Sequence, residues 1–525
     1  MAIISYSFIV FAALLLFVYY TVGRKYQWIV LLMANTVFYL TGGWKSALYL
    51  LVTLLTVYAV SRKLEAYNAE QNAVIGERKP DTKTKKEIKK IFDKKKRIWL
   101  LLAAFINIGI LCFVKYAAFL IENISGNRIT LPFSVIVPLG ISFYTFQAVG
   151  YVIDIYRGKT QAEKNIFKLA LFISFFPVIT QGPILRFDAV KEQLFSRHRM
   201  DYRTLTFGLQ RMVWGFFKKL VIAERLSVVY KSILENYADH SYYGILVFIG
   251  VFLGGLHTYV DFSGGMDIII GLSESLGIIL PENFERPFMS RTYSEFWKRW
   301  HISLGAWFKN YVFYPISLSG LFRKLTQKSK ARFGDTIGKV VAPSIASFIT
   351  FFIIGIWHGA NWKYVAYGIW QAFFVAQGTL LEPIYEKLRK YFHVNTERFS
   401  YRMFQIVRTV VLVTIGRYFS FAANLTDAWH LFGATLKKLN LYVLFDDTFY
   451  QLGLDEKNFR LMFASIILLW VVSVLQERGI EIRETIARQN IFLRWTIYLA
   501  GIFAVLIFGQ YGPGYDAAGF VYQGF

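Results

Sequence analysis

The chain has a single cysteine, Cys112, among 525 residues, which excludes an intramolecular disulfide framework and a multi-cysteine metal site. It also lacks a glycine-rich phosphate loop and a Gly-x-Ser-x-Gly elbow, so nucleotide hydrolysis and serine-hydrolase chemistry are disfavoured. No internal repeat is present, whereas many secondary transporters carry inverted repeats. Charged residues are scarce at 18%, while 55% of the residues are hydrophobic and occur in long blocks. This balance predicts a polytopic membrane protein.

The apolar blocks are long enough, or nearly so, to cross about 30 Å of hydrocarbon at about 1.5 Å per helical residue. They cover residues 3–22, 27–43, 46–61, 98–120, 135–154, 165–182, 206–223, 243–260, 341–357, 362–381, 404–423, 459–475 and 494–510. We therefore expect an all-α protein with roughly 11–14 transmembrane and re-entrant helices. The first block has neither the basic leader nor the cleavage site of a signal peptide, so we expect it to be retained as a span.

The distribution of charge predicts how the chain is oriented. The net charge is +25, but Lys and Arg cluster between apolar blocks, as positive-inside sorting and attraction to anionic lipid predict, and no nucleic-acid partner is expected. The densest cluster, residues 78–97, should be cytoplasmic, which places the N-terminus outside after three spans. Residues 186–203 are also basic, so block 165–182 predicts a re-entrant hairpin rather than a crossing.

Two histidines are embedded in polar and aromatic clusters inside otherwise apolar sequence. His358 ends the run Phe351–Trp357, and His301 closes Glu295-Phe296-Trp297-Lys298-Arg299-Trp300. A neutral imidazole can accept a proton from a hydroxyl, which suits general-base catalysis, although His358 could instead bridge two helices. Neither histidine has a second ligand at helical metal spacing, so no metal site is predicted. Solvated or structural roles are expected for the remaining histidines, His198, His240, His257, His393 and His430.

An acidic residue also lies directly after an apolar block. Asp261 follows block 243–260 and precedes Phe262-Ser263-Gly264-Gly265-Met266. Its ordinary structural roles would be to cap the next helix through Ser263 or to pair with a buried arginine. The alternative is a part in substrate binding.

Several motifs resemble the membrane-bound O-acyltransferase family, in the bacterial branch of alginate O-acetylation and teichoic-acid D-alanyl transfer proteins. They are residues 137–146 (VPLGISFYTF), 181–187 (QGPILRF), 261–264 (DFSG), 283–288 (NFERPF), 295–304 (EFWKRWHISL) and 357–360 (WHGA). The resemblance is dense over residues 137–372. It divides the chain into N-terminal transmembrane helices at 1–61, a basic cytoplasmic loop at 62–97, a catalytic core at 98–381 and C-terminal transmembrane helices at 382–525.

The resemblance implies that His358 is the catalytic histidine and His301 the second active-site residue, near a thin partition in a funnel or tunnel of helices. The other motif members that could bind substrate are Asp261, Ser263, Trp297, Arg299, Trp300, Trp357, Asn361 and Gln181. Two positions depart from the family pattern, because Gln371 stands where relatives often have histidine and Gly265-Met266 where they often have Tyr-Ser. These departures leave the acceptor open.

The resemblance further implies a bacterial cytoplasmic-membrane enzyme with no bound cofactor. Its acyl donor would be a thioester in the cytoplasm, acetyl-CoA or a phosphopantetheinyl carrier protein. The acceptor would be a cell-surface or secreted polysaccharide, or an extracytoplasmic esterase-like transferase, and the acyl group most simply acetyl. D-alanyl transfer to teichoic acid is the alternative within the family. A transporter or flippase of an acyl group or lipid-linked glycan, with histidines that gate protons, is the alternative outside it.

Overall fold

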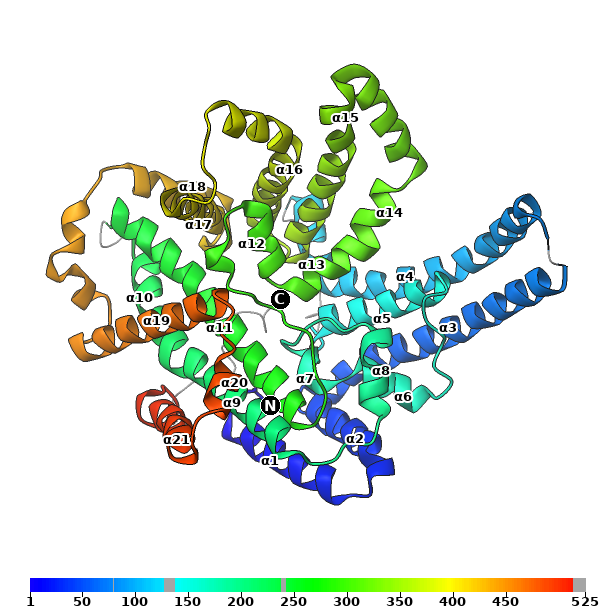
Figure 1. Ribbon diagram of the computed structural model, residues 1–525, viewed down its shortest axis with the longest axis horizontal. Coiled ribbons are helices and arrows are strands. Elements are labelled where there is room, and N and C mark those ends of the chain that lie inside the picture. The colour runs from blue at the N-terminus through cyan, green and yellow to red at the C-terminus, as the bar shows by residue number, and fades with distance from the viewer. Residues whose placement is uncertain (79, 127–136, 238–241, 513–525) are drawn as a thin grey trace. The chain divides into compact units, whose positions relative to one another are not determined.

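The computed structural model describes residues 1–78, 80–126, 137–237 and 242–512, and Figure 1 shows that these ranges are built from helices. Within them no β-strand forms, and a bridge between Phe284 and Trp300 is the single β-type pairing. In the part of the chain that the structure describes, seven helices are long and apolar enough to cross a membrane: α3 (Trp44–Arg78), α4 (Thr82–Ser125), α11 (Ile245–Ser275), α15 (Gly320–Trp357), α17 (Phe399–Phe421), α19 (Glu456–Glu477) and α21 (Ile491–Phe508). The prediction of an all-α polytopic membrane protein is confirmed.

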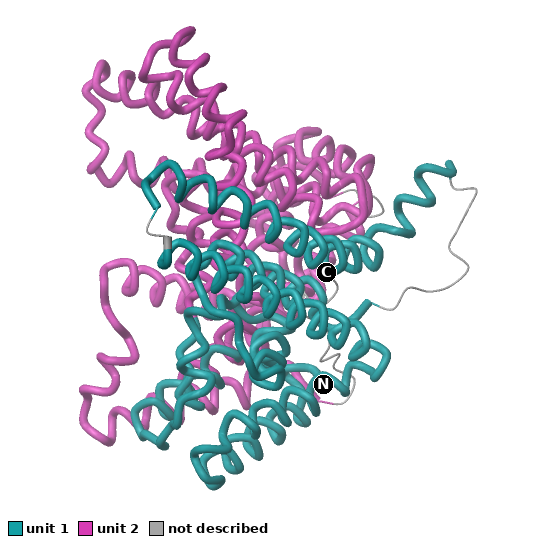
Figure 2. The backbone as a smooth tube through the Cα atoms, turned by 90° about the vertical axis from the view of Figure 1, so that its right-hand side faces the viewer, with its two compact units in different colours: residues 1–209, 269–280, 517–525 teal, residues 210–268, 281–516 magenta. Residues whose placement is uncertain are grey.

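The chain forms two compact units, coloured separately in Figure 2, and each is described by itself. Of the described residues, the first unit comprises those within 1–209 and 269–280, and the second those within 210–268 and 281–512. Besides α3 and α4, the first unit contains α1 (Tyr6–Thr21), η1 (Arg24–Tyr26), α2 (Gln27–Leu40), α5 (Ile141–Tyr156), α6 (Ile166–Ile173), α7 (Phe176–Ile179) and α8 (Phe187–Phe195). Two helices, α9 (Tyr202–Phe216) and α11, belong partly to each unit.

The second unit holds the remaining helices, among which α15 and α16 make the most extensive contact. They are η2 (Phe217–Ala223), α10 (Glu224–Glu235), η3 (Pro287–Met289), α12 (Tyr293–Arg299), α13 (Ile302–Phe308), η4 (Lys309–Phe313), α14 (Tyr314–Ser317), α16 (Trp362–Tyr391), α18 (Leu425–Leu436), η5 (Leu441–Leu444), η6 (Asp447–Gln451) and α20 (Ile482–Ala487). Helix α15 turns back on itself at Gly334, whose φ of 74° suits glycine, and Gly338 there packs on the backbone of Lys330.

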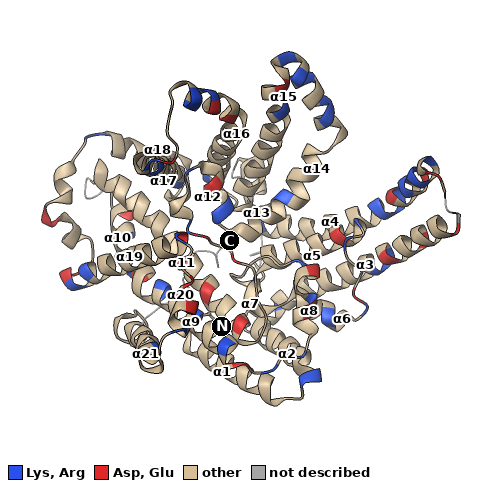
Figure 3. Ribbon diagram, in the orientation of Figure 1, with Lys and Arg blue, Asp and Glu red and all other residues tan. Residues whose placement is uncertain are grey.

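In the first unit, the basic stretch before residue 98 is helical. Asp81 caps α4 by accepting hydrogen bonds from the backbone amides of Lys83 and Thr84, and α4 then runs without interruption to Ser125. Ile88 and Phe92 are buried, while the lysines gather at the tip of the α3–α4 arm, shown in blue in Figure 3. The stretch at 62–97, expected to be a basic loop, therefore lies mostly in a helical arm formed by α3 and α4.

The structure also changes the reading of two apolar blocks. Block 165–182 forms α6, of eight residues, and α7, of four, and both are too short to cross a membrane, as expected for this block. The predicted boundary after residue 260 is wrong, because α11 continues through Asp261 to Ser275. Asp261 therefore caps no helix, and its pairing has to be sought on a neighbouring element.

Candidate functional site

A close crossing of two helices places His358. A Cβ on Gly355 of α15 would lie 2.1 Å from the Cα of Gly368 of α16, so the two backbones touch at a spot where no side chain fits. His358 follows directly as the C-cap of α15 and is 7% exposed. Its ring packs against those of Tyr364 and Tyr367, with centroids 6.4 and 5.4 Å away. The glycine pair thus brings the imidazole against the first turns of α16.

A backbone carbonyl sets the tautomer of His358. Its Nδ1 lies 2.8 Å from the carbonyl oxygen of Ile354, which can only accept a hydrogen bond. The proton of the neutral ring is therefore on Nδ1, and the lone pair is on Nε2. A histidine in this form presents a proton acceptor at Nε2, as a general base must.

His301 is positioned by a short stretch of strand-like pairing. The amide of Glu285 donates to the carbonyl of Arg299 at 2.9 Å, and that of Ile302 donates to the carbonyl of Asn283 at 3.0 Å. Between these bonds His301 takes a left-handed conformation with φ of 46°, which costs free energy for a residue other than glycine. The backbone is thereby turned so that the imidazole is 2% exposed, and Phe262 contacts it edge-on at 5.1 Å.

The side chain of Asn283 fixes the tautomer of His301. The backbone amide of Ser303, an obligatory donor, points at Oδ1 of Asn283 from 2.9 Å, so this atom is the amide oxygen. The same oxygen lies 3.4 Å from Nδ1 of His301, which therefore donates, and the lone pair of this ring is also on Nε2. Burial, followed by the nearby His358, lowers the pKa of His301 to about 3, which keeps the ring neutral.

Trp357 connects the two imidazoles. Its ring lies 5.1 Å from that of His358 and 6.4 Å from that of His301, between centroids. We call His301, Trp357 and His358 the histidine cluster. It brings together the turn before α13 and the end of α15, at least 56 positions apart in the sequence, and Phe262 of α11 contacts it.

Helix α11 also carries buried ion pairs. Asp261, 0% exposed, receives Nζ of Lys219 at 2.6 Å, and Lys219 also pairs with Glu224 at 2.7 Å. Lys218 pairs with Asp267 at 2.7 Å and donates to the hydroxyl of Ser263 at 2.9 Å. Both lysines lie on the π-helical turn η2, next to the close approach of Gly215 to Gly264.

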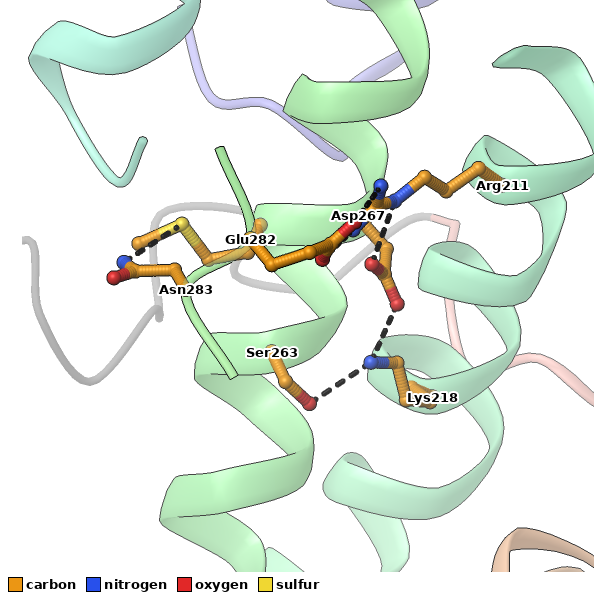
Figure 4. Close-up of polar contacts among 7 residues, drawn as sticks. Arg211, Lys218, Ser263, Asp267, Glu282 and Asn283 are labelled. Atoms are coloured by element: carbon orange, nitrogen blue, oxygen red, sulfur yellow. Dashed lines mark hydrogen bonds and ion pairs between the residues drawn. The ribbon is translucent and has the colours of Figure 1, made fainter. Parts of the chain in front are cut away.

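Figure 4 shows how this ion network continues toward Asn283. Nε of Arg211 donates to Asp267 at 2.9 Å, and its terminal nitrogens bind both carboxylate oxygens of Glu282, the residue before Asn283. Nδ2 of Asn283 in turn donates to the sulfur of Met266 at 3.4 Å. The ion network, comprising Arg211, Lys218, Lys219, Glu224, Asp261, Asp267 and Glu282, thus holds the segment that orients His301.

Comparison of the sequence with known proteins identifies the family to which the chain belongs. Residues 163–331 match the membrane-bound O-acyltransferase family. The chain is 31% identical to the probable alginate O-acetylase AlgI of Pseudomonas syringae pv. tomato, over 81% of this chain and 73% of that protein. It belongs to the membrane-bound O-acyltransferase family. The chain is also 28% identical to the peptidoglycan O-acetyltransferase of Helicobacter pylori, over 63% of each protein, and 30% identical to the teichoic acid D-alanyltransferase of Bacillus subtilis, over 46% of this chain and 58% of that protein.

As a member of this O-acyltransferase family the protein is an enzyme. The motif residues predicted to bind substrate differ in their contacts. Trp297 packs on Phe351 at 5.6 Å, and its buried indole N–H has no hydrogen-bond partner among the described residues. Trp300 stacks on Phe296 at 5.5 Å. Arg299 is committed to ion pairs with Glu295 and Glu477.

Other predicted substrate-binding residues lie elsewhere or have structural partners. The side chain of Asn361 caps α16 by accepting from the amide of Lys363 at 3.0 Å. Asp261 and Ser263 face the lysines of η2. Gln181 belongs to the first unit, where it is completely buried and its side-chain amide finds no partner in the described part of the chain. Among the described residues no group of three or more His, Cys, Asp or Glu could hold a metal ion, and His240 lies outside them.

Sequence reasoning missed several residues that lie in or beside the candidate site. Asn283 was part of a quoted motif but carried no role, and the buried pair Lys218 and Lys219 was hidden in block 206–223. Arg417 of α17 is 7% exposed and lies with its guanidinium 4.9 Å from the ring centre of Trp300. A signal existed for all three cations, since charged residues inside apolar blocks mark functional or paired sites.

Proposed function

We propose that the protein transfers a short acyl group, acetyl, from a thioester donor in the cytoplasm to hydroxyls of an exported polysaccharide. The donor is acetyl-CoA or a phosphopantetheinyl carrier protein, and a secreted esterase-like transferase can take the place of the polysaccharide as immediate acceptor. His358 acts as general base and His301 orients the reacting hydroxyl. The alginate and peptidoglycan relatives named above support acetyl and a surface glycan.

The reaction needs one proton to move away from the acceptor and back to the leaving group. Nε2 of His358 takes the hydroxyl proton as the oxygen bonds to the acyl carbon. The carbon–sulfur bond then breaks, and the thiolate leaves with the proton that His358 returns. His301, with its lone pair also on Nε2, accepts a hydrogen bond from the hydroxyl and so fixes its approach.

The tautomer of His358 is the observation that carries this proposal. A histidine that merely bridged two helices would bond through Nδ1 to another helix, whereas Nδ1 of His358 donates to the carbonyl of Ile354 on its own helix, and the lone pair is on Nε2. The anchor lies within the same turn of helix, so it holds the imidazole without help from a substrate.

The test compares surface-glycan ester content in cells that lack the protein and are complemented with wild type, His358→Ala or His301→Ala at equal membrane abundance. His430→Ala is the matched control, because this histidine is exposed on α18. Wild type and the control should restore the esters and His358→Ala should not, while the released acid identifies the acyl group. Release of D-alanine would replace the acetyl assignment with D-alanyl transfer.

Full ester content with His358→Ala would instead make that histidine structural and remove the proposal. A glycan that fails to reach the surface, with its acylation unchanged, would favour the transporter alternative. Purified protein then offers a second readout, because an enzyme releases free thiol from the donor and a transporter does not.

A further inference from the structure

Arg417 is a buried cation that the structure leaves without a counter-ion. It lies on α17 and is 7% exposed, and its guanidinium makes no hydrogen bond or ion pair with any described residue. The guanidinium packs on the face of Trp300, 4.9 Å from guanidinium carbon to ring centre. A cation–π contact offsets part of the cost of burying a charge, but it leaves all five N–H donors of the guanidinium unused.

Other buried cations of the second unit show what complete pairing looks like. Lys219 has two carboxylates, and Lys218 has a carboxylate and a hydroxyl. Arg225, 5% exposed, donates to the side chain of Asn458 and the carbonyl of Val221 at 2.9 Å each. Among these four buried cations, Arg417 alone has no carboxylate, amide, hydroxyl or carbonyl partner for its charged group, so the guanidinium can bind a group that the protein itself does not supply.

Arg417 is adjacent to the histidine cluster. Trp300, under its guanidinium, directly precedes His301. The neighbouring Gly416 packs so closely on α16 that a Cβ there would lie 3.0 Å from Nε2 of Gln371. Gln371 is one helical turn after Tyr367 on α16, and the ring of Tyr367 contacts that of His358. An anion held by Arg417 would therefore lie beside the reacting groups.

The helix that carries Arg417 indicates from which side the anion comes. The connections before α17 and within the first half of α15 are basic, which places that end of these helices on the cytoplasmic side under the positive-inside rule. Arg417 lies 18 residues after Phe399, about 27 Å along the helix at 1.5 Å per residue. It is therefore near the opposite, extracytoplasmic end, where an acceptor rather than a thioester donor would enter.

We propose that Arg417 binds an anionic group, a carboxylate or a phosphate, of the acceptor molecule and so selects acidic polymers. Only the statement that the bound molecule is the acyl acceptor rests on the proposed function, because anion binding itself needs no acyl transfer. The planar guanidinium can donate two parallel hydrogen bonds to either group, which gives the site orientation as well as charge.

The test measures binding to the purified full-length protein by titration calorimetry without acyl donor. The probes are an oligouronate, which bears carboxylates, an oligo(glycerol phosphate), which bears phosphates, and a neutral gluco-oligosaccharide of similar length. All are measured at physiological ionic strength, because the net charge of +25 attracts anions at long range. We expect one of the two anionic oligomers to bind at least tenfold more tightly than the neutral one.

Arg417→Met should raise the Kd of that oligomer at least tenfold and leave the Kd of the neutral one unchanged. This variant keeps an apolar stem of similar length and removes an unpaired charge, so it should fold. Arg417→Lys, which keeps the charge but loses the paired donors, should raise the Kd about threefold. Arg408→Gln on the same helix, exposed and donating to the carbonyl of Arg291, is the matched control for charge and should bind like wild type.

Unchanged binding of both anionic oligomers to Arg417→Met, or equal binding of neutral and anionic oligomers to wild type, would overturn the anion site. Arg417-dependent binding by a protein that never acylates a glycan would keep the site and remove the proposed function. Acylation of a glycan in cells, together with oligomer binding that does not depend on Arg417, would keep the proposed function and remove the anion site.

Discussion

The ion network and the histidine cluster bury polar groups in opposite ways. In the network Asp267 receives both Arg211 and Lys218, and Arg211 also binds Glu282, so each charge has partners inside the protein. In the cluster each imidazole is anchored through Nδ1, by Ile354 or by Asn283, and the tautomer directs a lone pair to Nε2. Complete pairing stabilises a helix contact, whereas anchoring at one atom prepares the other for chemistry.

Removal of the imidazole of His358 is the sharpest way to test this difference. We expect His358→Ala to lower acyl transfer by about 10²–10⁴-fold, because a positioned general base contributes about that much. Its unfolding in detergent should stay close to that of wild type, since the hydrogen bond of Nδ1 goes to Ile354 within the same helix and does not tie two helices together. Transfer by purified protein and unfolding by titration with sodium dodecyl sulfate are measured side by side. Equal losses in both measurements would make His358 part of the packing instead.

The ion network should give the opposite result. Asp267→Ala leaves the buried charge of Lys218 without its carboxylate, and we expect a loss of about 3–5 kcal/mol in the free energy of unfolding. The double variant Lys218→Met with Asp267→Leu removes both charges, while Arg211 keeps Glu282, so it should recover most of that stability. A double variant as unstable as Asp267→Ala would mean that the network is more than a set of paired charges.

Asn283 connects the two regions, and its variants should give an intermediate effect. Asn283→Ala removes the acceptor that fixes the His301 tautomer, and we expect transfer to fall about 10- to 100-fold through loss of orientation. Asn283→Asp keeps an oxygen for Ser303 and His301 and should restore part of the activity. A purely structural asparagine would not be rescued in this way, since aspartate places a charge in a buried position. Full activity of Asn283→Ala would remove the orienting role.

The helices were largely predictable, since hydropathy alone detects long apolar spans. Blocks 459–475 and 494–510 fall within three residues of α19 and α21. The end of α11 was missed because Asp261 interrupts the hydropathy of its block, while its partner Lys219 lies 42 residues earlier on another helix. A buried ion pair restores helix continuity in a way that no window along one segment can detect.

The histidines of the site were predictable for a different reason. His301 and His358 are polar residues in apolar sequence, and the structure brings them together through Trp357. The direction of the α11 side chains was not predictable, because it depends on the π-helical turn that presents Lys218 and Lys219 side by side. The lack of a counter-ion for Arg417 was likewise not predictable, since it depends on which residues surround the guanidinium in the folded protein.

The smallest effect is expected where pairing is complete but partly exposed. Glu477 receives Arg286 at 2.7 Å and Arg299 at 2.9 Å, and its side chain is 36% exposed. Water screens such pairs, so Glu477→Gln should lower the free energy of unfolding by about 1 kcal/mol or less and leave transfer near that of wild type. Both are measured as for His358→Ala. A large fall in transfer at unchanged stability would break the comparison, because a fully paired carboxylate would then act on the histidine cluster through α12, the helix that ends beside His301.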